Sequence, residues 1–249
     1  MFMTAHVMGI TKSTVHRAIH SAMSQILLKF SQLIRFPTNL NQVKRDFEAK
    51  FNMPGIIRCI DCVHVKIKST SREVGEIFHN RKGYFSINVQ AVCGPDYMFY
   101  DAVIRWQGSA HDARIFEWSA LYDRLETRQL TGILLGDSGY PLLPFCLTPY
   151  RNPVTVQQNR KKLIIIDKKM YFFQTREVRL KSTEPLLKLI SCTFIVHNIC
   201  QAHHDDINAI PEIRIHAMEI QDGEEIGDEF AGEINRIGNS VRDEICKNL

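Results

Sequence analysis

Two β-strand patterns joined by a tight turn constrain this fold more than any other feature of the sequence. Residues 84–93 and 97–106 are rich in β-branched and aromatic side chains, which favour strands. The Gly-Pro-Asp sequence at 94–96 supplies turn-forming residues, so the two runs predict an antiparallel hairpin. Residues 58–68 end in alternating apolar and polar side chains and predict another strand.

The elements after the hairpin are predicted to be mostly helical. Residues 111–126 carry apolar side chains at helical spacing and predict one helix, and the apolar run at 132–136 predicts a short buried strand. Residues 182–204 predict a helix that begins at Ser182. Three strands, a helix, a strand and a helix indicate an α/β domain with a mixed sheet.

Composition excludes several other classes of protein. The chain has 249 residues, of which 45% are hydrophobic and 23% charged, which is typical of globular proteins rather than disordered or collagen-like ones. No apolar run is long enough to span a membrane, and residues 1–10 lack the features of a secretory signal. The 7 cysteines are odd in number and scattered, which favours a reducing compartment.

Charge divides the chain into a basic body and an acidic end. Residues 1–60 carry 8 basic and 2 acidic residues, and residues 61–204 carry 19 and 13. Residues 205–249 reverse the balance, with 4 basic and 12 acidic residues, and are expected to form an exposed acidic tail. The basic body indicates a polyanionic partner such as DNA, with an ordinary solvated surface as the alternative.

The N-terminal region contains a string similar to the turn and second helix of a helix-turn-helix. Residues 9–28 predict an amphipathic helix capped by Thr11 or Ser13. Polar side chains near the start of such a helix can contact DNA bases or phosphates, and here these are Lys12, Ser13, Thr14 and Arg17. The alternative is a plain amphipathic helix. The chain begins too close to this string for a full preceding helix, so we expect a partial helix-turn-helix.

Two aspartates stand next to apolar strand patterns, where an unpaired carboxylate is costly to bury. Asp61 lies inside the 58–68 strand, and Asp137 directly follows the 132–136 strand. If these strands are neighbours, the two carboxylates can meet and hold a Mg²⁺ or Mn²⁺ ion for phosphodiester cleavage. The alternative for each is an aspartate that caps a turn.

Six motifs around these aspartates resemble those of the PIF/Harbinger DDE transposases and the nucleases derived from Harbinger transposases. In family order they are GIIRCIDCVHV (55–65), NRKGYFSINVQAVC (80–93), WQGSAHDARIF (106–116), LGDSGYPL (135–142), LTPYRNP (147–153) and VHNIC (196–200). The resemblance implies an RNase H-like fold and metal-dependent DNA cleavage or strand transfer. Asp61 and Asp137 match the first two acids of the family's metal-binding triad.

The third acid of the family is a glutamate on a helix, and its surrounding pattern is missing from this sequence. Asp167 is the best positional match, so it is the predicted third ligand of a divalent metal, Mg²⁺ or Mn²⁺. Glu177 and Glu184 are weaker matches. This departure favours the alternative function, a catalytically inactive DNA-binding or adaptor protein that retains the transposase fold.

Further implications of the resemblance concern DNA and partners. Arg81 and Lys82 are predicted phosphate contacts, with a solvated surface as the alternative. His64 and the His111–Asp112 pair fall near the family's active face, where they would orient DNA or water, with ordinary hydrogen-bonded structure as the alternative. The family commonly works with a separate Myb/SANT-like DNA-binding protein, and we expect the nucleus, with the cytoplasm as a second location.

The predicted organisation therefore has three parts. Residues 1–53 form a helical segment with a partial helix-turn-helix, residues 54–204 form the RNase H-like DDE nuclease domain, and residues 205–249 form the acidic C-terminal tail.

Overall fold

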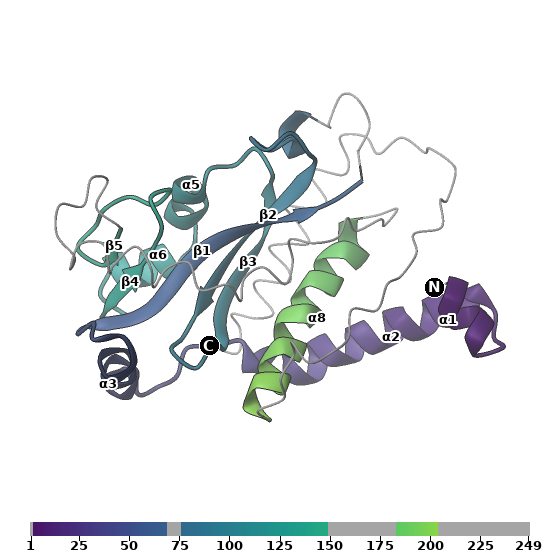
Figure 1. Ribbon diagram of the computed structural model, residues 1–249, viewed down its shortest axis with the longest axis horizontal. Helices are drawn as coiled ribbons and strands as arrows, with labels where there is room; N and C mark the ends of the chain where they lie inside the picture. The colour runs from purple at the N-terminus through teal and green to yellow at the C-terminus, as the bar shows by residue number, and fades with distance from the viewer. Residues whose placement is uncertain (1, 69–75, 149–182, 204–249) are drawn as a thin grey trace.

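The computed structural model describes residues 2–68, 76–148 and 183–203, and their centre is a five-stranded mixed sheet (Figure 1). The strand order is β3-β2-β1-β4-β5. The strands are β1 (Ile56–Lys66), β2 (Ser86–Cys93), β3 (Phe99–Gln107), β4 (Ile133–Leu135) and β5 (Cys146–Leu147). This mixed sheet with flanking helices confirms the predicted α/β class and is consistent with an RNase H-like fold.

Strand direction changes at β1, the central strand. On one side β1 pairs antiparallel with β2, and β2 pairs antiparallel with β3, which is the predicted hairpin. On the other side β1 pairs parallel with β4, and β4 pairs parallel with β5. β4 therefore ends beside Cys59 of β1, two residues before Asp61.

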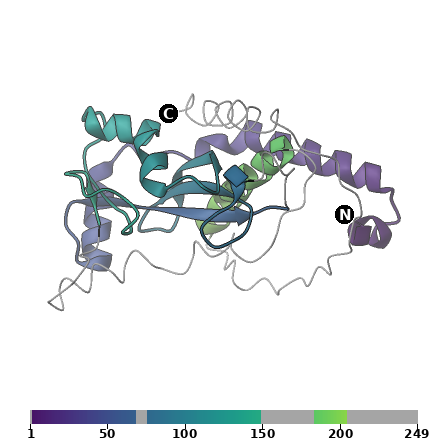
Figure 2. The same ribbon diagram turned by 90° about the horizontal axis from the view of Figure 1, so that it is seen from above.

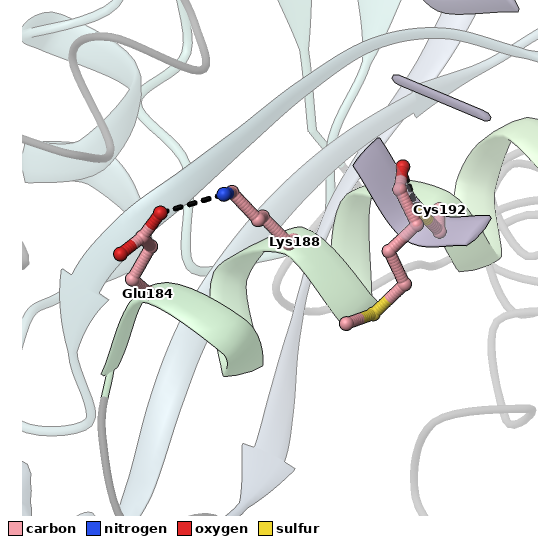
Figure 3. Close-up of polar contacts among 4 residues, drawn as sticks. Glu184, Lys188 and Cys192 are labelled. Carbon is pink, nitrogen blue, oxygen red and sulfur yellow. Dashed lines mark hydrogen bonds and ion pairs between the residues drawn. The ribbon is translucent and has the colours of Figure 1, made fainter. Parts of the chain in front are cut away.

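One face of the sheet is covered by two helices from opposite ends of the sequence. α2 (Lys12–Phe30) and α8 (Thr183–Ala202) share a core with β1, β2 and β3, to which α2 contributes Met23 and Leu27. The Cys192 thiol donates a hydrogen bond to the Met23 carbonyl oxygen at 3.4 Å and joins the two helices (Figure 3). A segment inside predicted residues 1–53 thus packs directly on the predicted nuclease domain.

The opposite face is covered by α5 (Asp112–Glu117) and α6 (Ala120–Glu126), and α3 (Leu40–Phe51) packs near the start of β1. The prediction of one helix over residues 111–126 was wrong, because the helix is broken at Ser119. The Ser119 hydroxyl donates to the Phe116 carbonyl oxygen and accepts from the Tyr122 N–H, so it ends one helix and caps the next.

The N-terminal end of α2 lies far from β4 and β5, at the other end of the molecule (Figures 1 and 2). The short helix α1 (Phe2–Val7) precedes it, and the Thr11 hydroxyl caps α2 by accepting from the Thr14 N–H at 3.2 Å. None of the helices in the described residues has the length and apolar character that crossing a membrane requires.

Asn198 on α8 has a fully buried side chain, which forms hydrogen bonds both to β3 and to the backbone at Leu33. Its side chain accepts from the Phe99 N–H of β3 and donates to the Phe99 carbonyl oxygen, at 2.8 and 2.7 Å. It also donates to the Leu33 carbonyl oxygen at 3.0 Å. This arrangement explains the asparagine of the VHNIC motif as a structural residue.

We expect Asn198→Ala to lower the free energy of unfolding by about 2–3 kcal/mol, because it leaves buried backbone groups without partners. Urea denaturation followed by circular dichroism measures this loss. Thr193→Ala is the control, since that side chain lies on the same helix and bonds only the carbonyl oxygen of Leu189. A loss below 1 kcal/mol for Asn198→Ala contradicts the assigned role.

Candidate active site

The parallel pairing of β1 and β4 brings Asp61 and Asp137 to the same level of the sheet. Cys59 on β1 pairs with Leu135 on β4. Asp61 lies two residues beyond Cys59, and Asp137 lies two residues beyond Leu135. The two carboxylates therefore follow paired positions on neighbouring strands, and the charge of Asp137 contributes to raising the pKa of Asp61.

Both carboxylates are half-buried and lie in an environment that disfavours their charge. Burial raises the pKa of Asp61 to about 7; the Cys62 backbone N–H opposes this rise, and the charges of Asp137 and Asp112 add to it. Burial likewise raises the pKa of Asp137, against the hydrogen bond from the Gly139 backbone N–H and with a further contribution from Asp112. A cation bound between them would relieve this repulsion.

Asp61 and Asp137 lie where β1 and β4 run side by side, and we call this place the acidic edge. The loop before β2 carries two exposed cations near it. The Lys82 charge lowers the pKa of Asp61, and the Arg81 charge lowers the pKa of Asp137. Asn80 shapes this loop, because its buried side chain accepts hydrogen bonds from the backbone N–H groups of Lys82 and Tyr84. The two predicted phosphate contacts thus lie close enough to the carboxylates to act on them electrostatically.

Asp112 was predicted only to orient DNA or water as part of the His111–Asp112 pair, and not as a metal ligand. Asp112 begins α5, and its charge acts on Asp61, on Asp137 and on His64. The HD pair of the WQGSAHDARIF motif was the available signal. The closeness of Asp112 to Asp137 could not be predicted, because it depends on how α5 folds back over the sheet.

The predicted helix-turn-helix residues of α2 are not brought to this edge. The start of α2, where DNA contacts were predicted, lies at the far end of the molecule, and the hydroxyls of Ser13 and Thr14 share hydrogen bonds with the Thr11 hydroxyl at 2.9 Å each. Glu184 forms an ion pair with Lys188 at 2.6 Å (Figure 3). Asp167 and Glu177 lie outside the described residues.

The donor set fits a hard divalent cation, which prefers carboxylate and water oxygens. Within residues 2–68, 76–148 and 183–203, no lysine, arginine or histidine forms an ion pair with Asp61, Asp112 or Asp137. In the same residues no three His, Cys, Asp or Glu side chains are close enough together to hold an ion. The described carboxylates therefore supply part of a coordination shell, and water or phosphate oxygens would complete it.

Comparison with protein families identifies the same region of the chain. The family described as DDE superfamily endonuclease matches residues 60–168, a range that contains Asp61, Asp112, Asp137 and Asp167. No solved structure matches the chain.

The curated proteins similar to this chain include several named as nucleases. "Putative nuclease HARBI1" of Rattus norvegicus is 31% identical over 156 residues, which are 61% of this chain and 44% of that protein. The Homo sapiens protein of the same name is 27% identical over 221 residues, 82% of this chain and 63% of that protein. "Protein ALP1-like" of Arabidopsis thaliana is 28% identical over 162 residues, 59% of this chain and 40% of that protein. The chain thus spans less than two thirds of the length of these relatives.

Proposed function

Since the chain belongs to the family of nucleases derived from Harbinger transposases, we propose that it hydrolyses phosphodiester bonds of DNA in a reaction that requires Mg²⁺ or Mn²⁺. The β1–β4 register carries this proposal, because it places Asp61 and Asp137 at one level of the sheet with raised pKa values. Asp167, the best positional match to the family's third acid, is the proposed third ligand.

Two different groups of residues would bind the cation and the DNA. Asp61 and Asp137 would bind the cation, which supplies activation of water and stabilisation of the leaving oxygen when bound. Arg81 and Lys82 would attract the phosphate backbone and bring the scissile group to the carboxylates. The half-buried setting strengthens these electrostatic interactions relative to bulk water.

Nicking of supercoiled plasmid by the purified 249-residue chain tests the proposal. We expect nicking with Mg²⁺ or Mn²⁺ and none in excess EDTA. The alternative function is an inactive DNA-binding or adaptor protein, favoured by the missing glutamate pattern and by the absence of a three-ligand cluster in the described residues. DNA binding without nicking or metal binding supports this alternative and contradicts the nuclease proposal.

Neutralising the loop before β2 should weaken DNA binding in a salt-dependent way. We expect Arg81→Ala with Lys82→Ala to reduce the slope of log affinity against log salt concentration by about 1.8, because each lost phosphate contact removes about 0.9 from that slope. Fluorescence anisotropy with a labelled duplex at several salt concentrations measures it.

The matched variant is Lys12→Ala with Arg17→Ala, which also removes two cations but at the far end of the molecule. A reduced slope for this variant supports a second DNA contact at the proposed helix-turn-helix. An unchanged slope for the Arg81 and Lys82 variant contradicts the proposed path of DNA over the acidic edge.

The arrangement of the whole protein is part of the same proposal. We propose a helical segment at 1–53, a nuclease domain at 54–204 and an acidic tail at 205–249. A basic body that acts on DNA fits a nuclear location, with the cytoplasm as a second one, and a Myb/SANT-like partner would supply further sequence selectivity. Co-purification of such a partner from nuclear extract, with and without residues 205–249, tests the last point.

A further inference from the structure

Asp112 approaches Asp137 closely at the acidic edge. A β-carbon added to Gly139 would lie 3.0 Å from Asp112 Oδ2 and 3.0 Å from Asp137 Oδ1. These two carboxylate oxygens are therefore no more than about 6 Å apart. Two carboxylates at this separation can share one divalent cation or hold it through bound water, since Mg²⁺ is commonly bound by one or two carboxylates with water and phosphate oxygens.

A buried asparagine fixes the orientation of Asp112. Asn88 on β2 has no exposed surface, and its side-chain nitrogen donates to Asp112 Oδ1 and to the Ala110 carbonyl oxygen, at 3.0 Å each. These bonds use both amide hydrogens. Asp112 Oδ1 is thereby held against the sheet, while Asp112 Oδ2 is the oxygen near Gly139 and Asp137.

The same asparagine carries an acceptor without a partner. Asn88 Oδ1 is buried and has no hydrogen-bond donor among the described residues. A buried acceptor next to a half-buried carboxylate is costly unless a donor or a cation compensates it. This unpartnered amide oxygen is an observation independent of the carboxylates, and it belongs to the residue that holds Asp112 in place.

We propose that Asp112 is a further ligand of the divalent cation, which it holds together with Asp137, and that Asn88 is the positioning residue for its carboxylate. This inference rests on the proposed metal-dependent function and deepens it. The family's third acid is a glutamate on a helix, and its pattern is missing here. Asp112 would supply a helical carboxylate from α5. Asp61 would reach the same cation through bound water, because no three acidic side chains of the described residues are close enough to hold one ion directly.

A purely structural explanation of Asp112 exists and predicts a different result. An acidic residue in the first turn of a helix interacts favourably with the helix dipole. Asp123 also lies in the first turn of a helix, as the fourth residue of α6, which is another short helix on the same face of the sheet. Asp123→Asn is therefore a control, because it also removes an acidic charge from the first turn of a short helix.

Mn²⁺ binding to the full chain, measured from the free Mn²⁺ signal in electron paramagnetic resonance, tests the proposal without any nuclease assay. We expect Asp112→Asn to weaken Mn²⁺ binding by at least 10-fold, and Asp123→Asn to leave it unchanged. Asp112→Asn keeps an acceptor for Asn88, so its thermal unfolding without metal should match that of the wild type. Asp112→Glu should restore part of the binding.

The outcomes separate this inference from the proposed function. If Asp112→Asn binds Mn²⁺ like the wild type while Asp137→Asn loses binding, the role of Asp112 is overturned. The same result supports the proposed metal site at Asp137. Equal loss of thermal stability in Asp112→Asn and Asp123→Asn, with no difference in Mn²⁺ binding, supports the dipole explanation and overturns the inference. A wild-type chain that binds no Mn²⁺ overturns both.

Discussion

Replacing Asp61 with asparagine is expected to reduce metal-dependent plasmid nicking by at least about 10²-fold, the scale on which loss of one preorganised charge-stabilising group acts. The substitution removes the charge but keeps the shape of the side chain and the oxygen that accepts from the Cys62 N–H at 2.7 Å. Initial nicking rates at saturating Mg²⁺ measure the effect, and Asp123→Asn is the control at full activity.

Loss of activity in Asp61→Asn should come without loss of stability. Asp61 is half-buried among like charges, and its raised pKa means that folding disfavours the ionised form. Removal of that charge should therefore leave the melting temperature unchanged or higher in the absence of metal. Wild-type nicking rates in Asp61→Asn would exclude the carboxylate from the reaction, and a lower melting temperature would reveal damage to the fold.

The largest effect on stability is expected for Phe116→Ala, which should lower the free energy of unfolding by about 3–5 kcal/mol. Phe116 on α5 is fully buried. Its ring meets those of Tyr122, Tyr140 and Phe145 at centroid distances of 5.4, 5.8 and 6.5 Å. The substitution leaves a cavity in this aromatic cluster and loosens the helix that carries Asp112.

Chemical denaturation of the full chain measures this change, with Trp118→Ala as the matched control. Trp118 lies two residues further along the chain and is also a large aromatic residue, but its side chain is 65% exposed. Its removal should change stability by no more than about 0.5 kcal/mol. Similar losses in the two variants would contradict the assigned burial of Phe116 and the packing of α5 on the sheet.

The hairpin and the central strand could be predicted from the sequence because their signals are local. Alternating and β-branched side chains located β2 and β3 to within two residues, and the Gly-Pro-Asp turn joined them. The amphipathic pattern likewise located α2, with Thr11 as one of its two predicted caps. In each case the side chains that define the pattern also make the stabilising contacts.

Other parts of the fold depend on interactions that a sequence pattern does not contain. The break between α5 and α6 depends on two hydrogen bonds of the Ser119 hydroxyl, which compete with a continuous helix. α3 was not predicted, although Val43 and Phe47 bury one of its faces. β5 is only two residues long, too short for a periodic pattern.

Some residues of the candidate site could likewise be predicted from local sequence, and others could not. Asp61 and Asp137 stand out in the sequence because each is an acid next to an apolar strand. Asp112 does not directly follow a strand. It comes close to Asp137 only when α5 packs across β2 and the Asn88 side chain donates a hydrogen bond to its carboxylate. Residues that reach a site through tertiary packing give no signal in local spacing.

The parallel pairing of β1 with β4 also has a kinetic consequence. The two strands are far apart in the chain, and the antiparallel hairpin of β2 and β3 lies between them. Closing so long a loop is entropically unfavourable, so non-local pairing of this kind slows folding relative to hairpins. The acidic edge can assemble only after the slow pairing step, so in refolding chains Asp61 and Asp137 would come together later than most of the secondary structure forms.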